Sequence, residues 1–337
     1  MKVLVVGGTG SISREIVAEL IARGHDTTVF NRGLREAALP HGVRTITGDR
    51  TDRASFERAL GGEGFDAVID MIAYNPEDAE STLRALRGRA GQLIFTSSVA
   101  CSKRPFRRMP PIREEEVEYV DDPANGYGYN KGRMERYLIE RFSEAPITIV
   151  RPSLTFGRGG NNIGIFRQNF GLVKRMRDGK RVVLFGDGES PMNFTFTPDI
   201  ARGYAAILGN RKAYGRIYHL VSDEYSTWND LYRAIGNAAG ADPEIVHLPT
   251  ELLVAAAPKL NAHLYDDKHW VNLFDSSKAR QDLDFRPHLA LESGFRWILE
   301  WYDGGHDTAI KADVDRFEDE LVELYDRFKA EISGRLS

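Results

Sequence analysis

The chain has 337 residues, which is enough for about two domains of ordinary size. Hydrophobic residues make up 42% and charged residues 28%, as in a folded globular protein, and 45 basic against 49 acidic side chains leave a net charge of −4. This charge argues against a protein that coats nucleic acid or an anionic membrane, because those proteins carry a basic excess. The single cysteine, Cys101, excludes an internal disulfide framework and a multi-cysteine metal site.

The same features predict where the protein resides. A single cysteine favours a reducing compartment. No apolar run approaches the roughly 18 residues of a membrane-spanning helix, and the first apolar run meets Gly7 and Gly8 too early for a signal peptide. We therefore expect a cytoplasmic protein with no membrane contact.

The first 150 residues alternate between short apolar runs and segments with helical periodicity. The expected strands are residues 2–6, 27–30, 43–47, 67–71, 92–96 and 147–150, and the expected helices are residues 12–21, 53–60, 76–86 and 127–142. Because the strands are apolar throughout and are separated by helices, they predict an α/β fold with a doubly wound parallel sheet covered on both faces.

The alternation stops after Arg151 and Pro152, and two later strand-like pieces, residues 193–196 and 216–221, could return to the sheet. We therefore expect two lobes. Residues 1–152 plus about 193–222 form a dinucleotide-binding domain. Residues from about 153–192 plus 223–337 form a smaller, mixed α/β substrate lobe with C-terminal helices.

The last segment, residues 313–332, places its apolar side chains on one helical face. Such a face either packs on the body of the same chain or binds a partner helix. We favour the first alternative, because a single amphipathic helix usually covers its own core.

A glycine-rich loop, residues 7–13, lies between the first expected strand and the first expected helix. Its glycines permit positive φ and let the backbone approach a pyrophosphate, while the helix N-terminus offers free N–H groups. Gly7 and Gly10 occupy two of the three glycine positions of a Rossmann-type motif, and the third holds the small residue Ser13. The alternative is a tight turn without ligand. The predicted cofactor-binding residues of this loop are Gly7, Thr9, Gly10, Ser11 and Ile12.

The end of the second strand predicts which cofactor binds. Asn31 stands where an acidic residue would contact the adenosine ribose, and Arg32 follows it, with Arg35 nearby. An arginine would bind a 2′-phosphate that an acid would repel, so NADP is favoured and NAD is possible; the alternative is two solvated loop arginines. Asp49, with Arg50 beside it, either accepts from the adenine amino group or caps the helix that begins at residue 53.

Tyr127 and Lys131 open the long helix and share one face, because they are four residues apart. A phenol that exchanges a proton near neutral pH needs its pKa lowered from about 10, and an adjacent ammonium does this. A hydroxyl at the end of the fifth strand would complete the site. Tyr129 with Arg133 is a rival pair at the same spacing, and Lys131 could instead form a surface ion pair with Glu135.

With these three elements in order, the chain resembles the extended short-chain dehydrogenase/reductase family, which holds the nucleotide-sugar epimerases and dehydratases. The residues 70–74 and 29–33 look most like a divergent branch that includes chloroplast stem-loop RNA-binding proteins and many bacterial relatives. Further similar runs are Gly48-Asp49 with Asp52, residues 147–157, Gly186-Asp187-Gly188, Asp199-Ile200-Ala201, residues 275–278, and Trp297 with Trp301 and Tyr302.

The resemblance implies a catalytic triad of Ser98, Tyr127 and Lys131. Tyr127 would be the general acid and base, Lys131 would lower its pKa and hold the nicotinamide ribose, and Ser98 would hydrogen-bond the substrate oxygen. Ser97 is the alternative serine. The resemblance also places Ala73, Pro152 and Ser153 beside the nicotinamide. We expect a homodimer that binds a small sugar-like substrate.

Four positions depart from the family pattern. Leu154 and Met192 stand where epimerases hold the nucleotide diphosphate, and Val99 and Ala100 stand where 4,6-dehydratases have an Asp-Glu pair. We therefore expect hydride transfer at a hydroxyl or ketone carbon, as in an NAD(P)-dependent oxidoreductase or epimerase, without 4,6-dehydration.

The alternative function is a binding protein that keeps the cofactor fold but acts on RNA or a protein partner. A basic cluster at residues 103–108 could bind a phosphate or RNA, but Glu114, Glu115 and Glu116 follow it and the whole chain is acidic. A solvated loop is the favoured interpretation, and nucleic acid is not expected as a partner. The histidines and aspartates of residues 263–269 lack the spacing of a metal site, so no metal is expected.

Overall fold

The computed structural model describes residues 1–34, 39–160, 162–261 and 263–336, and the chain forms two compact units. Unit 1 consists of Met1–Gly157, Asn193–Asp223 and Leu273–His288. Unit 2 consists of Arg158–Met192, Glu224–Asn272 and Leu289–Ser337.

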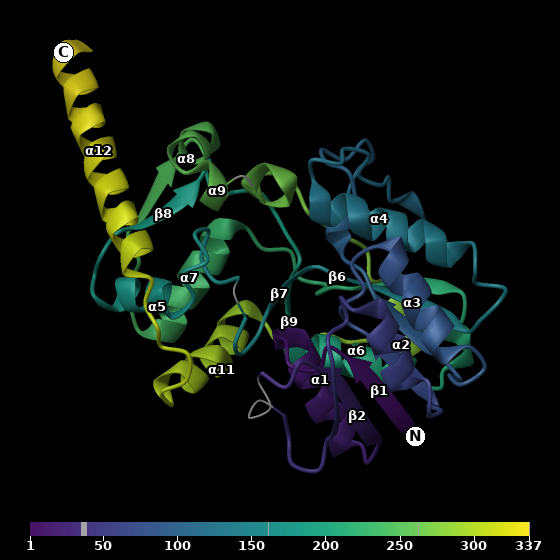
Figure 1. The fold of residues 1–337 in the computed structure, drawn as a ribbon. Helices are drawn as coiled ribbons and strands as arrows, with labels where there is room; N and C mark the ends of the chain where they lie inside the picture. The colour runs from purple at the N-terminus through teal and green to yellow at the C-terminus, as the bar shows by residue number, and fades with distance from the viewer. Residues whose placement is uncertain (35–38, 161, 262, 337) are drawn as a thin grey trace. The chain divides into compact units, whose positions relative to one another are not determined.

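Unit 1 is built on a seven-stranded sheet with the strand order β10-β6-β5-β4-β1-β2-β3, in which every neighbouring pair is parallel. The inner strands are buried along almost their whole length, which explains why they read as continuous apolar runs, whereas none of the four residues of the edge strand β3 is buried. The Rossmann-type, doubly wound parallel sheet is therefore confirmed (Figure 1). The strands are β1 (Lys2–Val6), β2 (Asp26–Asn31), β3 (Arg44–Thr47), β4 (Ala67–Asp70), β5 (Leu93–Thr96), β6 (Ile147–Pro152) and β10 (Arg216–Leu220).

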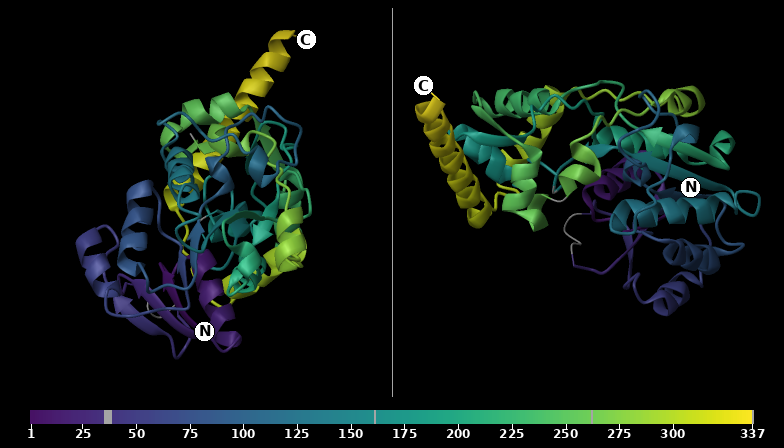
Figure 2. Two further views of the ribbon diagram at one scale, coloured as in Figure 1. Left: turned by 90° about the vertical axis from the view of Figure 1, so that its right-hand side faces the viewer. Right: turned by 90° about the horizontal axis from the view of Figure 1, so that it is seen from above.

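Helices cover both faces of this sheet (Figures 1 and 2). One face packs against α1 (Ser11–Ala22), α6 (Thr197–Ile207) and α10 (Ser277–Leu283), which contribute Ile16, Tyr204 and Leu283 to the core. The other face packs against helices that contribute Phe56 and Met134 to a second core. These helices are α2 (Arg53–Leu60), α3 (Pro76–Leu86) and α4 (Gly126–Ile139).

The structure corrects the expected connections at two places. The strand expected at residues 193–196 exists as β9 (Phe194–Phe196), but it pairs with β7 (Leu154–Phe156) in a separate two-stranded sheet. Residues 273–288, which the sequence interpretation gave to the second lobe, belong to unit 1, because Ala279, Leu283 and Phe285 pack in the core beside α6.

Unit 2 contains one two-stranded parallel sheet, in which β8 pairs with β11, surrounded by helices. Its core includes Trp228, whose ring packs edge-on against Phe185 with 5.2 Å between the centroids. The elements are α5 (Phe170–Arg177), β8 (Val182–Phe185), α7 (Trp228–Ala239), β11 (Ile245–Leu248), α8 (Thr250–Ala256), α9 (Pro258–Asn261), α11 (Leu291–Asp303) and α12 (Ala312–Leu336).

The C-terminal helix α12 packs on unit 2 through its first half. Leu321 and Val322 are buried, and Asp315 and Asp319 both form ion pairs with Arg175, at 2.8 and 2.7 Å. The second half extends beyond the other elements of unit 2 and exposes Leu324, Phe328 and Ile332 (Figures 1 and 2). Among the described residues, no helix combines the length and apolar character that crossing a membrane requires.

Candidate active site

The glycine loop joins β1 to α1 and has the backbone geometry that its sequence predicts. Gly7 has φ +87°, and a Cβ atom there would lie 2.6 Å from Cγ2 of Ile72. A Cβ at Gly8 would lie 2.6 Å from Cγ1 of Val29. Both positions therefore require glycine, one for its conformation and its close packing and the other for its close packing alone.

Ser13 takes the place of the third glycine without disturbing the turn. It is buried, and its hydroxyl accepts a hydrogen bond from the backbone N–H of Gly10 at 2.9 Å. Gly10 is the N-cap of α1, so the first N–H groups of this helix point toward the loop. The helix start offers the partial positive charge that binds phosphate groups.

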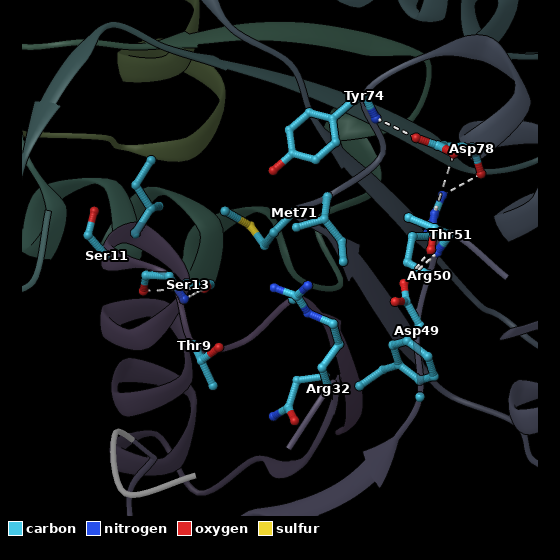
Figure 3. Close-up of a pocket in the computed structure, with 17 residues that line it drawn as sticks. Thr9, Ser11, Ser13, Arg32, Asp49, Arg50, Thr51, Met71, Tyr74 and Asp78 are labelled. Carbon is cyan, nitrogen blue, oxygen red and sulfur yellow. Dashed lines mark hydrogen bonds and ion pairs between the residues drawn. The ribbon is translucent and has the colours of Figure 1, made fainter. Parts of the chain in front are cut away.

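A cavity of about 500 Å³ lies in front of this loop, at the carboxyl ends of β1, β2 and β4 within unit 1 (Figure 3). Because the carboxyl ends of parallel strands form the usual ligand-binding edge of such sheets, this is the expected place for a dinucleotide. The predicted cofactor-binding residues that line it are Gly7, Thr9, Gly10, Ser11, Ile12, Asn31, Arg32, Asp49 and Arg50.

Asn31 and Arg32 reach the cavity from the end of β2. The Asn31 side-chain oxygen accepts from the Gly33 N–H at 2.6 Å, and its buried amide nitrogen has no hydrogen-bond partner among the described residues. Figure 3 shows the Arg32 guanidinium reaching into the cavity. The site thus carries a cation and an unused donor where an acid would otherwise stand. Arg35, the other predicted arginine, lies outside the described residues.

Asp49 does not cap a helix. Its Oδ1 accepts from the N–H and the hydroxyl of Thr51, at 2.8 and 2.7 Å, and Asp52 is the N-cap of α2 instead. The two hydrogen bonds from Thr51 lower the pKa of Asp49, and the charge of Arg32 lowers it further. Asp49 is therefore an ionised acceptor at the mouth of the cavity.

Arg50 lines the cavity but is buried and already paired. Its guanidinium donates to Asp70 at 2.9 Å and to the carbonyl of Asp78, and lies over the ring of Phe56 at 4.5 Å. These contacts tie the end of β3 to β4 and α3. Arg50 thus shapes the cavity wall, with its charge balanced inside the protein.

Lys131 is buried, which overturns the alternative of a surface ion pair with Glu135. Its ammonium donates to the backbone carbonyls of Ala73 and Thr96, at 2.7 and 2.6 Å. Burial lowers the pKa of Lys131 to about 8, and the charges of Asp70 and Glu135 oppose that shift. Glu135 instead pairs with Arg151, which holds α4 against β6 with both side chains fully buried.

Tyr127 lies in the first turn of α4, one turn before Lys131, and is 51% exposed. The Lys131 nitrogen lies 5.8 Å from the centroid of its ring. The rival residue Tyr129 packs instead against Arg133, which pairs with Glu77 at 3.7 Å on α3. The spacing of the two pairs is equal, but only Tyr127 shares the environment of a buried lysine.

The two serines after β5 differ in exposure. Ser97 is 1% exposed, whereas Ser98 is half-buried and its Oγ accepts from the N–H of Ala100 at 3.1 Å. That bond uses an acceptor position of Ser98, which leaves its O–H to donate. Thr96, before them, is buried and shares a hydrogen bond of 2.6 Å with the Tyr204 hydroxyl.

The three residues predicted beside the nicotinamide lie at the ends of strands. Ala73 follows β4, is buried, and accepts from Lys131. Pro152 ends β6, and the Ser153 hydroxyl shares a hydrogen bond of 2.8 Å with Thr195. None of the three is among the residues that line the described cavity.

The sequence analysis did not predict Tyr74 as a site residue, nor Asp70 and Asp78 beside it. Tyr74 lines the cavity, and its ring centroid lies 6.4 Å from that of Tyr127 and 4.8 Å from the Lys131 nitrogen. Its backbone N–H donates to Asp78 at 3.0 Å. The available signal was position, because Tyr74 follows the carboxyl end of β4, the strand that pairs with β1.

The basic loop at residues 103–108 is largely neutralised by acids. Lys103 pairs with Asp121 at 2.7 Å, and the Arg104 guanidinium donates to the carbonyls of Ser102 and Val99. Two longer pairs complete the loop, Arg107 with Glu118 at 3.7 Å and Arg108 with Glu116 at 3.8 Å.

Two curated relatives each match more than four fifths of this chain. The 2'-dehydrokanamycin reductase of Streptomyces kanamyceticus is 28% identical over 279 residues, which cover 82% of this chain and 77% of the reductase. The chloroplast stem-loop binding protein of 41 kDa b of Arabidopsis thaliana is 27% identical over 308 residues, which cover 87% of this chain and 77% of that protein.

Solved structures share the fold. The UDP-glucose 4-epimerase of Thermotoga maritima superposes with a TM-score of 0.72 at 21% identity, covering 90% of this chain and 99% of the epimerase. A UDP-glucuronic acid 4-epimerase of Bacillus cereus, in complex with UDP-glucuronic acid and NAD, gives a TM-score of 0.70 at 18% identity, covering 91% of this chain and 100% of that one.

The family model for NAD-dependent epimerases and dehydratases matches residues 3–220, which take in all the strands of the main sheet, the glycine loop and the Tyr127–Lys131 pair. A match over that much of the sequence confirms the resemblance drawn from the motifs. This chain belongs to the NAD-dependent epimerase/dehydratase family.

Proposed function

We propose that the protein is an NADP-dependent oxidoreductase or epimerase that transfers a hydride at a hydroxyl or ketone carbon of a small sugar-like substrate. The observation that carries the proposal is the Tyr127–Lys131 pair, in which a half-exposed phenol lies beside a buried ammonium. Tyr74 connects this pair to the glycine-loop cavity. Its ring contacts both Tyr127 and Lys131, and it also lines the cavity.

The cavity residues fit a nicotinamide dinucleotide. Gly7 and Gly10 line the cavity, α1 offers its N-terminal N–H groups, and Asn31 has an unused amide donor among the described residues. The cofactor, when bound, supplies the hydride donor or acceptor. Gly10, Ser11 and the start of α1 would hold its pyrophosphate.

In the proposed reaction Tyr127 donates its proton to the carbonyl oxygen as the carbon is reduced, and takes it back in the reverse direction. Two positive charges favour the phenolate that this leaves, the ammonium of Lys131 and the N-terminal end of α4. Ser98 donates a hydrogen bond to the same substrate oxygen and so stabilises its developing charge.

The catalytic test compares two tyrosine variants over a panel of UDP-, GDP- and dTDP-sugars and free sugar derivatives, with products identified by NMR. Tyr127→Phe should lower turnover roughly 10²–10⁴-fold, as for other general acid–base groups, with little change in cofactor affinity. Tyr129→Phe is the matched control and should lower turnover only slightly. The opposite pattern would reassign the proton transfer to Tyr129.

The same panel tests the substrate class. The side chains of Val99 and Ala100 cannot transfer a proton, and those of Leu154 and Met192 offer no hydrogen-bond donors to a diphosphate. Each diphosphate oxygen that loses water without gaining a hydrogen bond weakens binding by about 1–3 kcal/mol. We therefore expect no 4-keto-6-deoxy product and slow turnover of UDP-hexoses. Either a dehydrated product or fast UDP-hexose epimerisation would contradict this part of the proposal.

The cofactor preference rests on Arg32 and on the absence of an acid at the end of β2. One phosphate–guanidinium contact contributes roughly 1.5–3 kcal/mol, which corresponds to about 10- to 150-fold in affinity. Calorimetric titration should show NADPH binding more tightly than NADH, with the gap closing in Arg32→Ala. Arg23→Ala, which removes an exposed arginine that pairs with Glu19 and does not line the described cavity, is the control and should leave the gap unchanged. Equal affinities for the two cofactors in the wild-type protein would refute NADP preference.

RNA binding is the alternative function, favoured by the likeness to a chloroplast stem-loop binding protein. The ion pairs of the basic loop and the net charge of −4 argue against it, because exposed paired cations contribute little to phosphate binding. Retention of nucleic acid on purification, read from the 260/280 nm absorbance ratio after cofactor removal, would favour it.

A further inference from the structure

The ammonium of Lys131 has three N–H donors, and it lies between two backbone carbonyls and two aromatic rings. Two donors are used by the carbonyls of Ala73 and Thr96. In the part of the chain that the structure describes, its remaining contacts are with two aromatic rings, Tyr74 at 4.8 Å and Tyr127 at 5.8 Å from the nitrogen. The nearer ring is therefore that of Tyr74.

Tyr74 is placed to act through its ring. Its backbone is fixed by the N–H bond to Asp78, and its ring meets that of Tyr127 at an interplanar angle of 56°. Burial raises the pKa of Tyr74, and the charges of Asp70 and Asp78 raise it further, so its phenol stays neutral at physiological pH. A neutral ring presents its negative face to a cation and supplies no second base.

Four titratable side chains on neighbouring elements act on the charge of Lys131. Asp70 lies on β4, Asp78 on α3, Glu135 on α4 itself and Cys101 in the short turn after β5. None of these four forms an ion pair with the ammonium; Asp70 and Asp78 pair with Arg50, and Glu135 pairs with Arg151. The ammonium therefore depends on carbonyl dipoles and aromatic faces for its close contacts.

We propose that Tyr74 is a positioning residue whose ring covers the Lys131 ammonium and keeps it protonated beside Tyr127. Its catalytic consequence rests on the proposed function, but the contact itself does not. Loss of the ring weakens the charged form of Lys131, so the lysine gives up its proton at lower pH. The phenolate of Tyr127 then loses its neighbouring charge within the working pH range.

The direct test is the titration of Lys131 in the full-length protein without cofactor, by NMR of ¹³C-labelled lysine side chains. The Lys131 signal is identified by its loss in Lys131→Met. Tyr74→Leu should lower the pKa of Lys131 by about 0.4–1.5 units, the effect of losing one partly to fully desolvated cation–aromatic contact. Tyr74→Phe keeps the ring and should titrate like the wild-type protein.

Two controls isolate the ring. Tyr137→Leu removes a ring on α4 that lies 3.6 Å from the Arg141 guanidinium, and it should leave the pKa of Lys131 unchanged. A fluorinated phenylalanine at position 74 keeps the shape of the ring but weakens its negative face, so it should behave like Tyr74→Leu. The last variant decides the question even if leucine disturbs the local fold.

A second readout links the contact to turnover. The alkaline limb of the kcat profile should move to lower pH in Tyr74→Leu by the same amount as the pKa of Lys131, and should stay in place in Tyr74→Phe. Identical Lys131 titration in Tyr74→Leu and the wild-type protein would overturn the proposal, as would an equal shift in Tyr137→Leu. The Lys131 titration does not depend on turnover. An inactive wild-type protein would therefore refute the proposed function, while the titration would still decide whether Tyr74 keeps Lys131 protonated.

Discussion

Three glycines allow backbone strain and steric clash to be separated by experiment. Gly24, after α1, has φ +75°, and no atom of the described residues lies within 4 Å of an added Cβ, so Gly24→Ala introduces strain alone. Gly8 has no positive φ but would place a Cβ 2.6 Å from Val29, so Gly8→Ala introduces a clash alone. Gly7 has φ +87°, and an added Cβ would lie 2.6 Å from Ile72, so Gly7→Ala introduces both strain and a clash.

The expected losses in the free energy of unfolding follow from these distances. A left-handed backbone costs an alanine about 1–2 kcal/mol, and overpacking against a fixed core atom costs about 1–3 kcal/mol. Gly24→Ala and Gly8→Ala should each fall in one of these ranges. Gly7→Ala should cost about 2–5 kcal/mol, a large part of the about 5–15 kcal/mol of a whole domain.

Urea unfolding of the three variants measures these losses, and calorimetric titration with NADPH measures the second effect. Gly7 lines the cavity and Gly24 lies outside it, so NADPH affinity should fall at least about tenfold in Gly7→Ala and stay unchanged in Gly24→Ala. The reasoning is refuted if Gly7→Ala costs no more stability than Gly24→Ala, because the clash with Ile72 would then be relieved freely.

Two further predictions concern buried groups. Burial, together with the neighbouring Glu135 carboxylate, raises the pKa of the Cys101 thiol to about 12, so a thiol reagent should modify the native protein at least about a hundredfold more slowly than the unfolded chain; rapid labelling of native protein would contradict this. Burial also raises the pKa of the Glu318 carboxyl from 4.5 to about 7. The folded state therefore binds this proton more tightly than the unfolded state does. The resulting contribution to the free energy of unfolding is full below pH 4.5 and is lost as the pH rises through 7. Relative to Glu318→Gln, the wild-type protein should therefore lose up to about 3 kcal/mol between those pH values in urea unfolding, and parallel pH profiles of the two would show that Glu318 is ionised in the fold.

The inner strands of the sheet were predictable because they are buried on both faces. Such strands read as continuous apolar runs whatever their neighbours are, and α2 and α3 begin and end where the sequence placed them. The pairing of β9 was not predictable, because a three-residue strand fits a large sheet and a small one equally well. Its partner, β7, follows β6 after a single residue, Ser153, which no sequence periodicity could separate from it.

The candidate site was predictable where a motif fixes the backbone, and unpredictable where tertiary contacts decide. The glycine loop and the Tyr127–Lys131 pair have local spacing that carries their meaning. The pairing of Glu135 with Arg151, which frees Lys131 from it, depends on two elements 16 residues apart that only the fold brings together. Tyr74 belongs to the run 70–74 that resembles the divergent branch, but only the fold brings its ring beside Tyr127 and Lys131.

The order in which unit 1 is assembled along the chain has a consequence for synthesis. Strand β10, the partner of β6, is not made until residue 220, and Leu283 and Phe285 complete the core later still. A nascent chain or an excised fragment that ends at residue 157 would therefore leave the fully buried β6 as an open, apolar edge, which pairs readily with other chains. More than half of unit 2 would have to leave the ribosome before unit 1 could close, so chaperones should be found on this protein late in its translation.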